Sequence, residues 1–247
     1  MAEIRLEGAE VRIEDADGVP RTILSPTTLT LTEQRIGVIG GNGSGKSTLA
    51  RLVNGLVEPT AGRVSVDGLD VVRHGAAVRR KVGFCFTDPA AQLVMPTCVE
   101  DVELSLRRTV KDRVRRRQLA LETLARFGLA ERADVSVHAL SGGQRQLLAL
   151  AGVLATEPEV LVCDEPTTLL DLRNTRMIGD LLLSLPQQLV LVSHDLDLVR
   201  RCDRVLVVED GAVRFDGPAE EAVADYVASV DPADPATSTT PGRTSPA

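Results

Sequence analysis

The sequence of 247 residues is long enough to bury a large hydrophobic core, and its 43% of apolar residues is typical of one large globular domain or two closely packed ones. A formal net charge of −7 argues against a surface built to hold nucleic acid, because such surfaces gain most of their affinity by neutralising phosphates. No stretch approaches about 18 uninterrupted apolar residues, and the start lacks the basic and apolar regions of a signal peptide. We therefore expect a cytosolic protein unless a partner takes it elsewhere. Its four cysteines have no paired metal-ligand spacing, so buried thiols are predicted.

Three segments near the start of the chain are predicted to be antiparallel strands. Apolar and polar residues alternate over residues 4–13 and again over 24–31, with turn residues between them. Residues 63–69 continue this pattern. A β-rich layer of this kind would form one wall of a site beside it.

Residues 40–48 have the spacing of a phosphate-binding loop, a glycine followed after four residues by Gly-Lys-Ser. An apolar strand at 36–39 precedes the loop, and a helix that ends at Gly55 follows it. Glycines allow consecutive amides to turn inward around a phosphate at a helix N-terminus. In such a loop Lys46 contacts the β- and γ-phosphates of ATP, and the Ser47 hydroxyl binds Mg²⁺. The predicted nucleotide-binding residues of the loop are Gly40, Asn42, Gly43, Ser44, Gly45, Lys46, Ser47 and Thr48.

From about residue 99 to residue 140 the pattern becomes helical. One face of this insertion is predicted to be buried, formed by Val114, Leu121, Leu124 and Phe127. Residues 111–117 include five basic residues. Two interpretations of them remain open, a solvated helix face and a contact with an anionic membrane.

A second phosphate-binding helix end is predicted at Leu-Ser-Gly-Gly-Gln, residues 140–144. Ser141 can cap the helix that follows, while Gly142 and Gly143 expose its first amides and Gln144 begins its regular part. One phosphate tail seldom needs two such ends in one chain. Two copies arranged head to tail would bring one loop and one opposite motif together around each ATP. The alternative is an ordinary helix start whose glycines serve packing.

The apolar strand 160–163 is followed by two acids, Asp164 and Glu165, at the end where parallel sheets bind ligands. Neighbouring side chains of a strand point to opposite sides, so the two carboxylates can serve different purposes. Asp164 suits Mg²⁺, and Glu165 can orient or deprotonate an attacking water. Further strands at 189–193 and 204–208 complete a parallel core.

The alternation of strands and helices predicts an α/β fold. We expect an ATPase domain at residues 1–228, with a core at 1–87 and 146–228 and a helical subdomain at about 88–145. The end of the chain is rich in Asp, Pro, Ala, Ser and Thr, so residues 229–247 are predicted to be a disordered tail.

These motifs resemble those of the nucleotide-binding domains of ATP-binding cassette (ABC) transporters, over nearly all of residues 3–225. Residues 40–48 match the family's Walker A loop and residues 140–144 its signature. Residues 160–165 match its Walker B strand with the catalytic glutamate.

The resemblance implies a P-loop NTPase fold, in which a mixed, mainly parallel core carries an antiparallel β-subdomain and a helical subdomain. It also implies a D-loop aspartate at Asp171 and a γ-phosphate sensor at His194, although a lone histidine is otherwise more often structural. The expected activity is hydrolysis of ATP with Mg²⁺, in a dimer with an identical or different ABC ATPase subunit.

Two positions depart from the family pattern. Where the family has a glutamine after Phe86, this chain has Thr87, whose shorter side chain can still hydrogen-bond a water on Mg²⁺, and Gln92 comes five residues later. The family also stacks adenine on an aromatic ring before the Walker A loop. No aromatic residue precedes Phe84 here, and Ile13 is the nearest aligned candidate. Because an aliphatic contact lacks the π-face of a ring, weak selectivity for the base is expected.

Within the family, residues 88–93 and 96–102, with Thr87 and residues 33–40, look most like the ATPases of energy-coupling-factor importers, and among them the biotin-transport ATPase subunit. The resemblance implies a peripheral subunit at the cytoplasmic face of the membrane that powers uptake of a vitamin, with biotin as first candidate, or of a metal ion. Its implied partners are a transmembrane coupling subunit and a substrate-binding membrane subunit, and no nucleic acid. The alternative is a soluble ABC ATPase acting on DNA or ribosomes.

Residues 88–103 are predicted to form the docking groove for the membrane partner. They surround an apolar segment with acids, a composition suited to a partner helix with an apolar face and an arginine. These acids are Asp88, Glu100, Asp101 and Glu103. The alternative is that they only cap and solvate a helix start.

Overall fold

An antiparallel sheet occupies the first part of the chain in the computed structural model, which describes residues 1–14 and 18–230. Its strands are β1 (Ile4–Glu14), β2 (Pro20–Leu31), β4 (Ala61–Val66) and β5 (Leu69–Asp70), in the order β2-β1-β4-β5. Ile4 and Leu6 are buried and Arg5 between them is exposed, so alternate side chains of β1 face opposite sides of the sheet. The predicted antiparallel strands are confirmed, and a turn at 67–68 divides the third.

A second sheet runs through the middle of the molecule. Its strands are β3 (Arg35–Ile39), β6 (Val82–Cys85), β7 (Val160–Asp164), β8 (Gln188–Val192), β9 (Arg204–Glu209) and β10 (Ala212–Gly217), in the order β10-β9-β3-β8-β7-β6. All neighbours are parallel except β9 and β10. Every residue of β7 and β8 is buried, as expected for parallel strands covered on both faces. The residues that follow β3, β7 and β8 therefore meet at one edge of the sheet.

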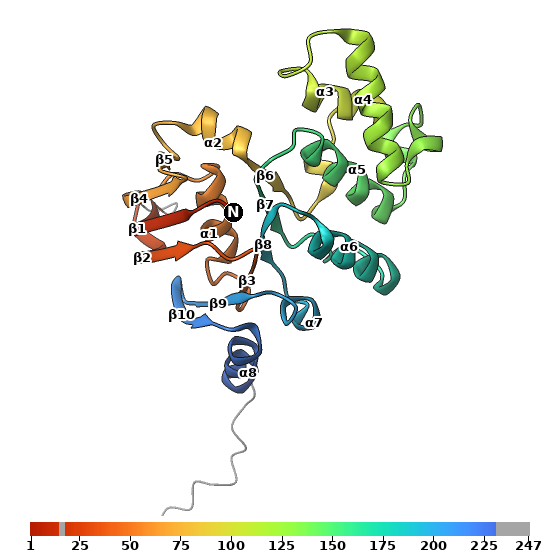
Figure 1. Cartoon of the computed structure of the whole chain (residues 1–247). Coiled ribbons are helices and arrows are strands. Elements are labelled where there is room, and N and C mark those ends of the chain that lie inside the picture. Colours follow the sequence, from red (N-terminus) through yellow and green to blue (C-terminus); the bar gives the residue numbers. More distant parts are fainter. Residues whose placement is uncertain (15–17, 231–247) are drawn as a thin grey trace, which may run out of the picture.

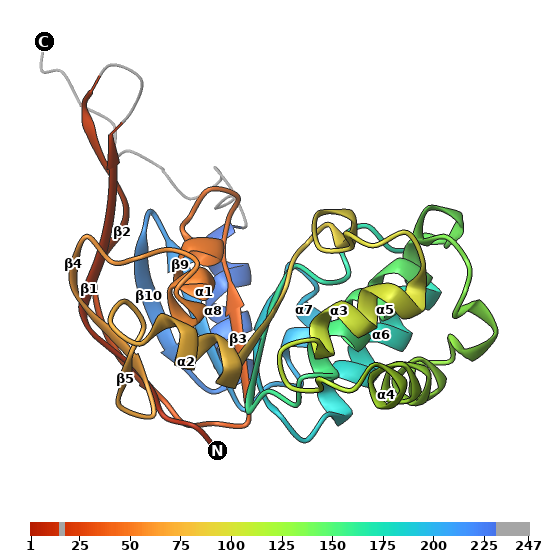
Figure 2. The same cartoon turned by 90° about the horizontal axis from the view of Figure 1, so that it is seen from above.

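Helices cover this sheet and form a separate lobe. They are α1 (Lys46–Asn54), α2 (Gly75–Lys81), α3 (Cys98–Leu106), α4 (Arg113–Arg126), α5 (Gly142–Leu154), α6 (Leu172–Ser184), α7 (Leu196–Val199) and α8 (Ala219–Val230), with short 3₁₀ helices η1 (Pro89–Ala91), η2 (Ala130–Arg132) and η3 (Val137–Ala139). Figures 1 and 2 show α1 and α2 beside the antiparallel sheet, whereas α3, α4 and α5 lie together in a lobe on the other side. Within the described ranges, no helix has both the length and the apolar composition needed to cross a membrane.

Three hydrophobic clusters hold these layers together. Val160 and Val162 of β7 join the cluster around α1 and the antiparallel sheet, whereas Leu161 and Cys163 join the cluster on the opposite face. The third cluster lies within the helical lobe and includes Val99, Val102, Leu106, Leu124, Leu129 and Leu148. All four cysteines are buried free thiols, as predicted, namely Cys85, Cys98, Cys163 and Cys202.

The buried face predicted for α4 is only partly correct. Leu124 is fully buried, but Val114 is 78% exposed and Leu121 is 39% exposed. Ala120 lies in the interior in their place. Each helical residue turns the chain by about 100°, so Leu121 points well away from the direction shared by Ala120 and Leu124, and the predicted stripe was too wide.

The division into domains stays a prediction. The helical lobe takes Leu148 and Ala151 from α5 into its hydrophobic cluster, so α5 contributes to both sides of the boundary predicted near residue 146. Of the predicted tail, residues 229 and 230 are the last two of α8, and residues 231–247 lie outside the described residues.

Candidate active site

The loop between β3 and α1 has a backbone that requires its glycines. Gly40, Gly43 and Gly45 have positive φ values of 147°, 76° and 104°, a region that residues with a side chain rarely adopt. At Gly40 an added Cβ would lie 2.0 Å from the carbonyl oxygen of Val208, so the loop passes directly against β9. The helix that follows ends at Gly55 in a left-handed conformation, as predicted.

Lys46 lies inside this loop and is 6% exposed. Its Nζ donates hydrogen bonds to the carbonyl oxygens of Gly40 at 2.9 Å and Gly41 at 2.7 Å. Burial lowers the pKa of Lys46, while the nearby carboxylates of Glu165 and Asp164 act in the opposite direction. The loop lysine and the two predicted acids therefore share one site.

Asp164 ends β7 with 1% exposure, and both of its carboxylate oxygens accept hydrogen bonds. Ser47 Oγ donates to Oδ1 at 2.8 Å, and Arg51 Nη2 donates to Oδ2 at 3.1 Å. The structure thus brings together the two residues predicted to bind Mg²⁺. Arg51 was missed, although it follows Ser47 by four residues on α1, a spacing that places both side chains on one helix face.

Glu165 turns out of the strand direction, with a φ of 55°. Its Oε1 lies 2.9 Å from Nε2 of His194, and its Oε2 accepts a hydrogen bond from Thr168 Oγ1 at 2.7 Å. His194 follows β8, the parallel neighbour of β7, so the ends of two adjacent strands deliver this pair. The two adjacent acids have different partners, as their positions in the sequence predicted. Thr168 was not predicted.

Thr87 stands where the family has a glutamine, and Gln92 is the next glutamine along the chain. Thr87 Oγ1 donates to the main-chain oxygen of Asp164 at 2.8 Å, so its hydroxyl lies at the edge of the site. Gln92 accepts from the amide of Phe86 at 3.3 Å and donates to the carbonyl of Ala149 at 3.0 Å. Both ends of the Gln92 side-chain amide are bound to the main chain, so Gln92 does not take the place of the missing family glutamine. The action of Thr87 on a Mg²⁺ water stays a prediction.

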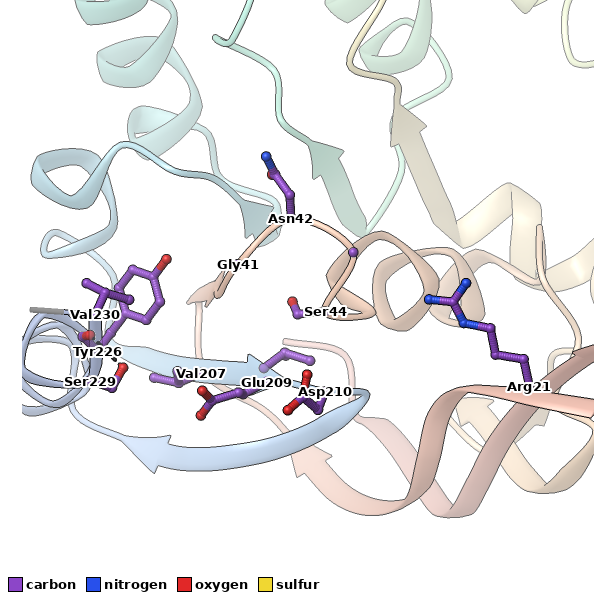
Figure 3. Close-up of a pocket in the computed structure, with 12 residues that line it drawn as sticks. Arg21, Gly41, Asn42, Ser44, Val207, Glu209, Asp210, Tyr226, Ser229 and Val230 are labelled. Atoms are coloured by element: carbon purple, nitrogen blue, oxygen red, sulfur yellow. Dashed lines mark hydrogen bonds between the residues drawn. The ribbon is translucent and has the colours of Figure 1, made fainter. Parts of the chain in front are cut away.

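A cavity of about 380 Å³ lies beside the phosphate-binding loop. Figure 3 shows Arg21 of β2 at one end of it, Asn42 and Ser44 in the middle, and Tyr226 of α8 at the other end. Sequence reasoning found neither Arg21 nor Tyr226, because nothing in their spacing links them to the loop. Ile13 is 48% exposed and is the cross-strand neighbour of Arg21. Its contact with a base stays a prediction.

The signature residues form a helix start in the other lobe. Ser141 caps α5 by accepting from the Gln144 amide at 3.3 Å, and the Gln144 side chain accepts from the Ser141 amide at 3.0 Å. At Gly143 an added Cβ would lie 2.6 Å from Oδ1 of Asn174, whereas at Gly142 the nearest atoms are 3.8 Å away. Packing therefore requires the second glycine and not the first. Figure 2 shows α5 and α1 in different lobes.

Asp171 caps α6, and its carboxylate accepts from the main-chain and side-chain nitrogens of Asn174 at 2.8 and 3.0 Å. Leu169 and Leu172 beside it are 64% and 66% exposed. In the predicted D-loop, the hydrogen-bonded carboxylate of Asp171 thus lies between the exposed side chains of Leu169 and Leu172 in the sequence.

The acids predicted to line a docking groove have different surroundings, and the prediction was wrong for Asp101. This residue is 6% exposed, and its Oδ1 accepts from the amides of Val94 and Met95 at 2.9 and 3.0 Å. Its carboxylate therefore fixes the chain that leads into α3. Glu100 completes a capping box with Thr97. A groove of about 300 Å³ beside α3 is lined by Met95, Glu100, Glu103 and Leu104, and by three arginines, Arg107, Arg113 and Arg116.

The residues at the sheet edge fit ATP and Mg²⁺. The loop amides and Lys46 offer donors and a positive charge for phosphates. Ser47 and Asp164 place a hydroxyl and a carboxylate oxygen 2.8 Å apart, and Mg²⁺ prefers oxygen ligands. Within the described part of the chain, no cluster of three or more His, Cys, Asp or Glu side chains could hold a metal by itself. A cation here would therefore share the phosphates of the nucleotide, as Mg²⁺ usually does.

Comparisons with known proteins agree with this geometry. A family model described as ABC transporter matches residues 24–168. A putative ABC transporter ATP-binding protein of Deinococcus radiodurans is 49% identical over 206 residues, which cover 83% of this chain and 91% of that protein. The biotin transport ATP-binding protein BioM of Rhizobium etli is 44% identical over 206 residues, 83% of this chain and 92% of that protein.

Two solved structures share the fold. CbiO1 from Clostridium perfringens, part of the ABC transporter complex cbiONQ, has a TM-score of 0.77 and 30% identity, covering 91% of this chain and 92% of its own. The ATP-binding cassette MJ0796, a dimer in a post-hydrolysis state bound to ADP and Pi, has a TM-score of 0.79 and 29% identity, covering 87% of this chain and 98% of its own.

Fold and site together define a P-loop nucleoside triphosphatase with a mixed central sheet, an antiparallel sheet and a helical lobe. More narrowly, the chain belongs to the ABC transporter family of ATP-binding proteins, and it is an ATPase. The predicted fold class and the resemblance to biotin-transport ATPases are confirmed.

Proposed function

We propose that this chain is the ATP-hydrolysing subunit of an importer, bound to the cytoplasmic face of the membrane, that takes up a vitamin or a metal ion, with biotin as the first candidate. The observation that carries the catalytic part is the pair formed by Glu165 and His194, 2.9 Å apart and next to Asp164. Similarity to a protein named for biotin transport supports the substrate. Other relatives have general names or are named for methionine import, so a measurement of uptake tests the choice of biotin.

In the proposed reaction, the loop amides and Lys46 would hold the β- and γ-phosphates, and Ser47 and Asp164 would hold Mg²⁺. Bound Mg²⁺ supplies positive charge that offsets the charge on the phosphate oxygens. Glu165 orients the attacking water and accepts its proton at the carboxylate. His194 fixes the direction of that carboxylate through its contact with Oε1, while Thr168 holds Oε2.

A second ABC ATPase subunit, identical or related, completes each site in this proposal. Figure 2 shows α5, which Ser141 caps, and α1, which follows the phosphate-binding loop, in different lobes, so we propose that the signature of one copy faces the loop of another. Leu169 and Leu172 are exposed beside Asp171 and supply apolar area for the contact. The similar cassette MJ0796 is dimeric, which supports this arrangement.

A membrane subunit is proposed to occupy the groove beside α3. The groove joins Leu104 and Met95 with Glu103 and several arginines, so it suits a short helix that has an apolar face and carries charges of both signs. Asp101 takes no part, since its carboxylate holds the main chain before α3.

The test combines purification and transport. Tagged chain isolated from native membranes is expected to bring a membrane subunit with it, and Glu103→Lys is expected to weaken this association without changing basal ATPase activity. A strain lacking the chain is expected to lose uptake of scarce biotin, restored by the wild type and not by Glu165→Gln. Unchanged biotin uptake would contradict biotin as the substrate. Recovery of ribosomes or DNA in place of a membrane protein would contradict the assignment as an importer subunit.

A further inference from the structure

The turn between α3 and α4 concentrates positive charge. Residues 107–117 contain seven of the 28 Lys and Arg residues in a chain whose net charge is −7. Asp112 is the single acid among them, and it is already used to cap α4, accepting from the Arg115 amide at 2.6 Å. A quarter of the cations of the chain thus lie at one end of the helical lobe, here named the basic turn.

Most side chains of the basic turn are exposed, and only some are paired. Arg117 forms an ion pair with Asp134 at 2.8 Å, and Arg115 lies 3.9 Å from Glu122. Within residues 1–14 and 18–230, no acid lies within ion-pair distance of four cations, Arg107, Arg108, Lys111 and Arg113. The positive charge of the turn is therefore largely uncompensated by the chain itself.

The arrangement is unfavourable for an isolated helix. Asp112 caps α4, but no acid lies within its first turn, so Arg113 and Arg115 place cations at the positive end of the helix dipole. Arg113 and Arg117 are four residues apart, a spacing at which like charges repel. Val114 lies among these cations and is 78% exposed. A partner that is both anionic and able to cover an apolar side chain would relieve all three features.

We propose that the basic turn binds anionic lipid headgroups at the membrane surface. Each Lys or Arg close to such a surface gains electrostatic attraction, and an apolar side chain between the cations can enter the boundary between headgroups and acyl chains. Nucleic acid is a poorer match, because residues 88–126 contain no Phe, Tyr or Trp on which a base could stack.

The position of the turn fits this role. Arg107 and Arg113 belong both to the basic turn and to the groove beside α3. A membrane subunit seated in that groove, as the proposed function has it, would hold the turn next to lipid. The lipid contact itself follows from the charge and exposure of the turn and can be measured with the isolated chain, so its failure would leave the result of the purification experiment untouched.

The experiment measures flotation of the full chain with lipid vesicles. One set contains phosphatidylcholine alone, and in the other phosphatidylglycerol replaces about a third of it. The test variant changes Arg108, Lys111 and Arg115 to Gln, three cations outside the groove lining. The control variant changes Arg73, Arg79 and Arg80 to Gln, which removes the same charge at exposed positions in and just before α2, in the other lobe.

The wild type and the control variant are expected to bind only the anionic vesicles and to be released at about 0.5 M salt, where screening is strong. The test variant is expected to bind on the order of 100-fold more weakly, as the loss of three cations near an anionic surface predicts. All three proteins should keep the same circular dichroism and basal ATPase activity. Equal binding to both vesicle types, equal losses in both variants, or binding of duplex DNA in place of vesicles would overturn the proposal.

Discussion

The sheet edge and the basic turn treat charged side chains in opposite ways. At the edge, Lys46 and Asp164 are buried, and Glu165 nearly so, and each is bound to other groups of the protein. In the turn, Arg108 and Lys111 are exposed and without an ion pair among the described residues. Chemistry requires charges held in fixed directions, whereas a docking surface needs charges that a partner can reach.

This difference predicts how strongly each region responds to substitution. A buried charge has lost its water and depends on its protein partners, so removing one partner is costly. Replacing an exposed charged residue changes the stability of the fold little, and the effect appears only when the binding partner is present. Expected effects on the isolated chain therefore decrease from the sheet edge outward.

The largest effect is expected for Glu165→Gln. The amide keeps the shape of the side chain and cannot accept a proton, so turnover should fall by about 10²- to 10⁴-fold. ATP affinity should be retained, and ATP should stabilise a dimer that is detectable by light scattering. Thr168→Ala is the comparison, because it removes the contact to Oε2 and leaves the base in place, so its turnover should fall much less than that of Glu165→Gln. Turnover close to the wild-type rate in Glu165→Gln would show that another group activates the water.

Gly142→Asp tests whether the second helix end acts across a dimer. The site has room for a side chain, since the nearest atoms to an added Cβ are 3.8 Å away, so the fold should survive. A carboxylate at this helix start would repel the γ-phosphate of the opposite site, and turnover should fall by about 100-fold or more. Monomer ATP affinity should stay nearly unchanged, and Gly142→Ala should keep most activity. Equal losses of affinity and turnover would place the signature in a site within one chain.

The features that sequence predicted best are those in which chemistry fixes both residue type and spacing. The phosphate-binding loop needs glycine where φ is positive, as at Gly40 and Gly45. It also needs a lysine directly after Gly45. The buried parallel strands follow from continuous apolar runs such as β7. Each of these features involves residues that are close together in the sequence, so it can be predicted from the sequence alone.

Features that depend on distant packing were harder to predict. The burial of Asp101 depends on the chain folding back so that the amides of Val94 and Met95 meet its carboxylate. The exposure of Val114 depends on where α4 rests on α3. One miss was avoidable, because Arg51 follows Ser47 by one helical turn. The alternative that the acids near α3 cap a helix start is confirmed for Glu100, which forms a capping box with Thr97.

Arg51→Met tests the support of the buried acid at the sheet edge. Asp164 is 1% exposed, and Arg51 supplies the donor to one of its two oxygens. The side chain of Arg51 is 42% exposed, so solvent weakens the pair, and the free energy of unfolding should fall by about 1 kcal/mol. Urea unfolding of Arg51→Met, Asp164→Asn and the double variant measures the coupling. Additive losses would mean that the two side chains do not support each other.

The smallest effect is expected where the nucleotide base should lie. Ile13 offers an aliphatic contact, so the wild-type chain should bind ATP and GTP with similar affinity in calorimetric titrations of the monomer. Ile13→Tyr should strengthen ATP binding by about three- to tenfold, because a ring can stack on the base. Val72→Tyr is a matched control, since Ile13 and Val72 are both 48% exposed and Val72 lies near α2. If Ile13→Tyr binds ATP no more tightly than Val72→Tyr, the base lies elsewhere. The cavity beside the loop would then be the next candidate, and Arg21→Ala, which alters its lining, should weaken binding of both nucleotides.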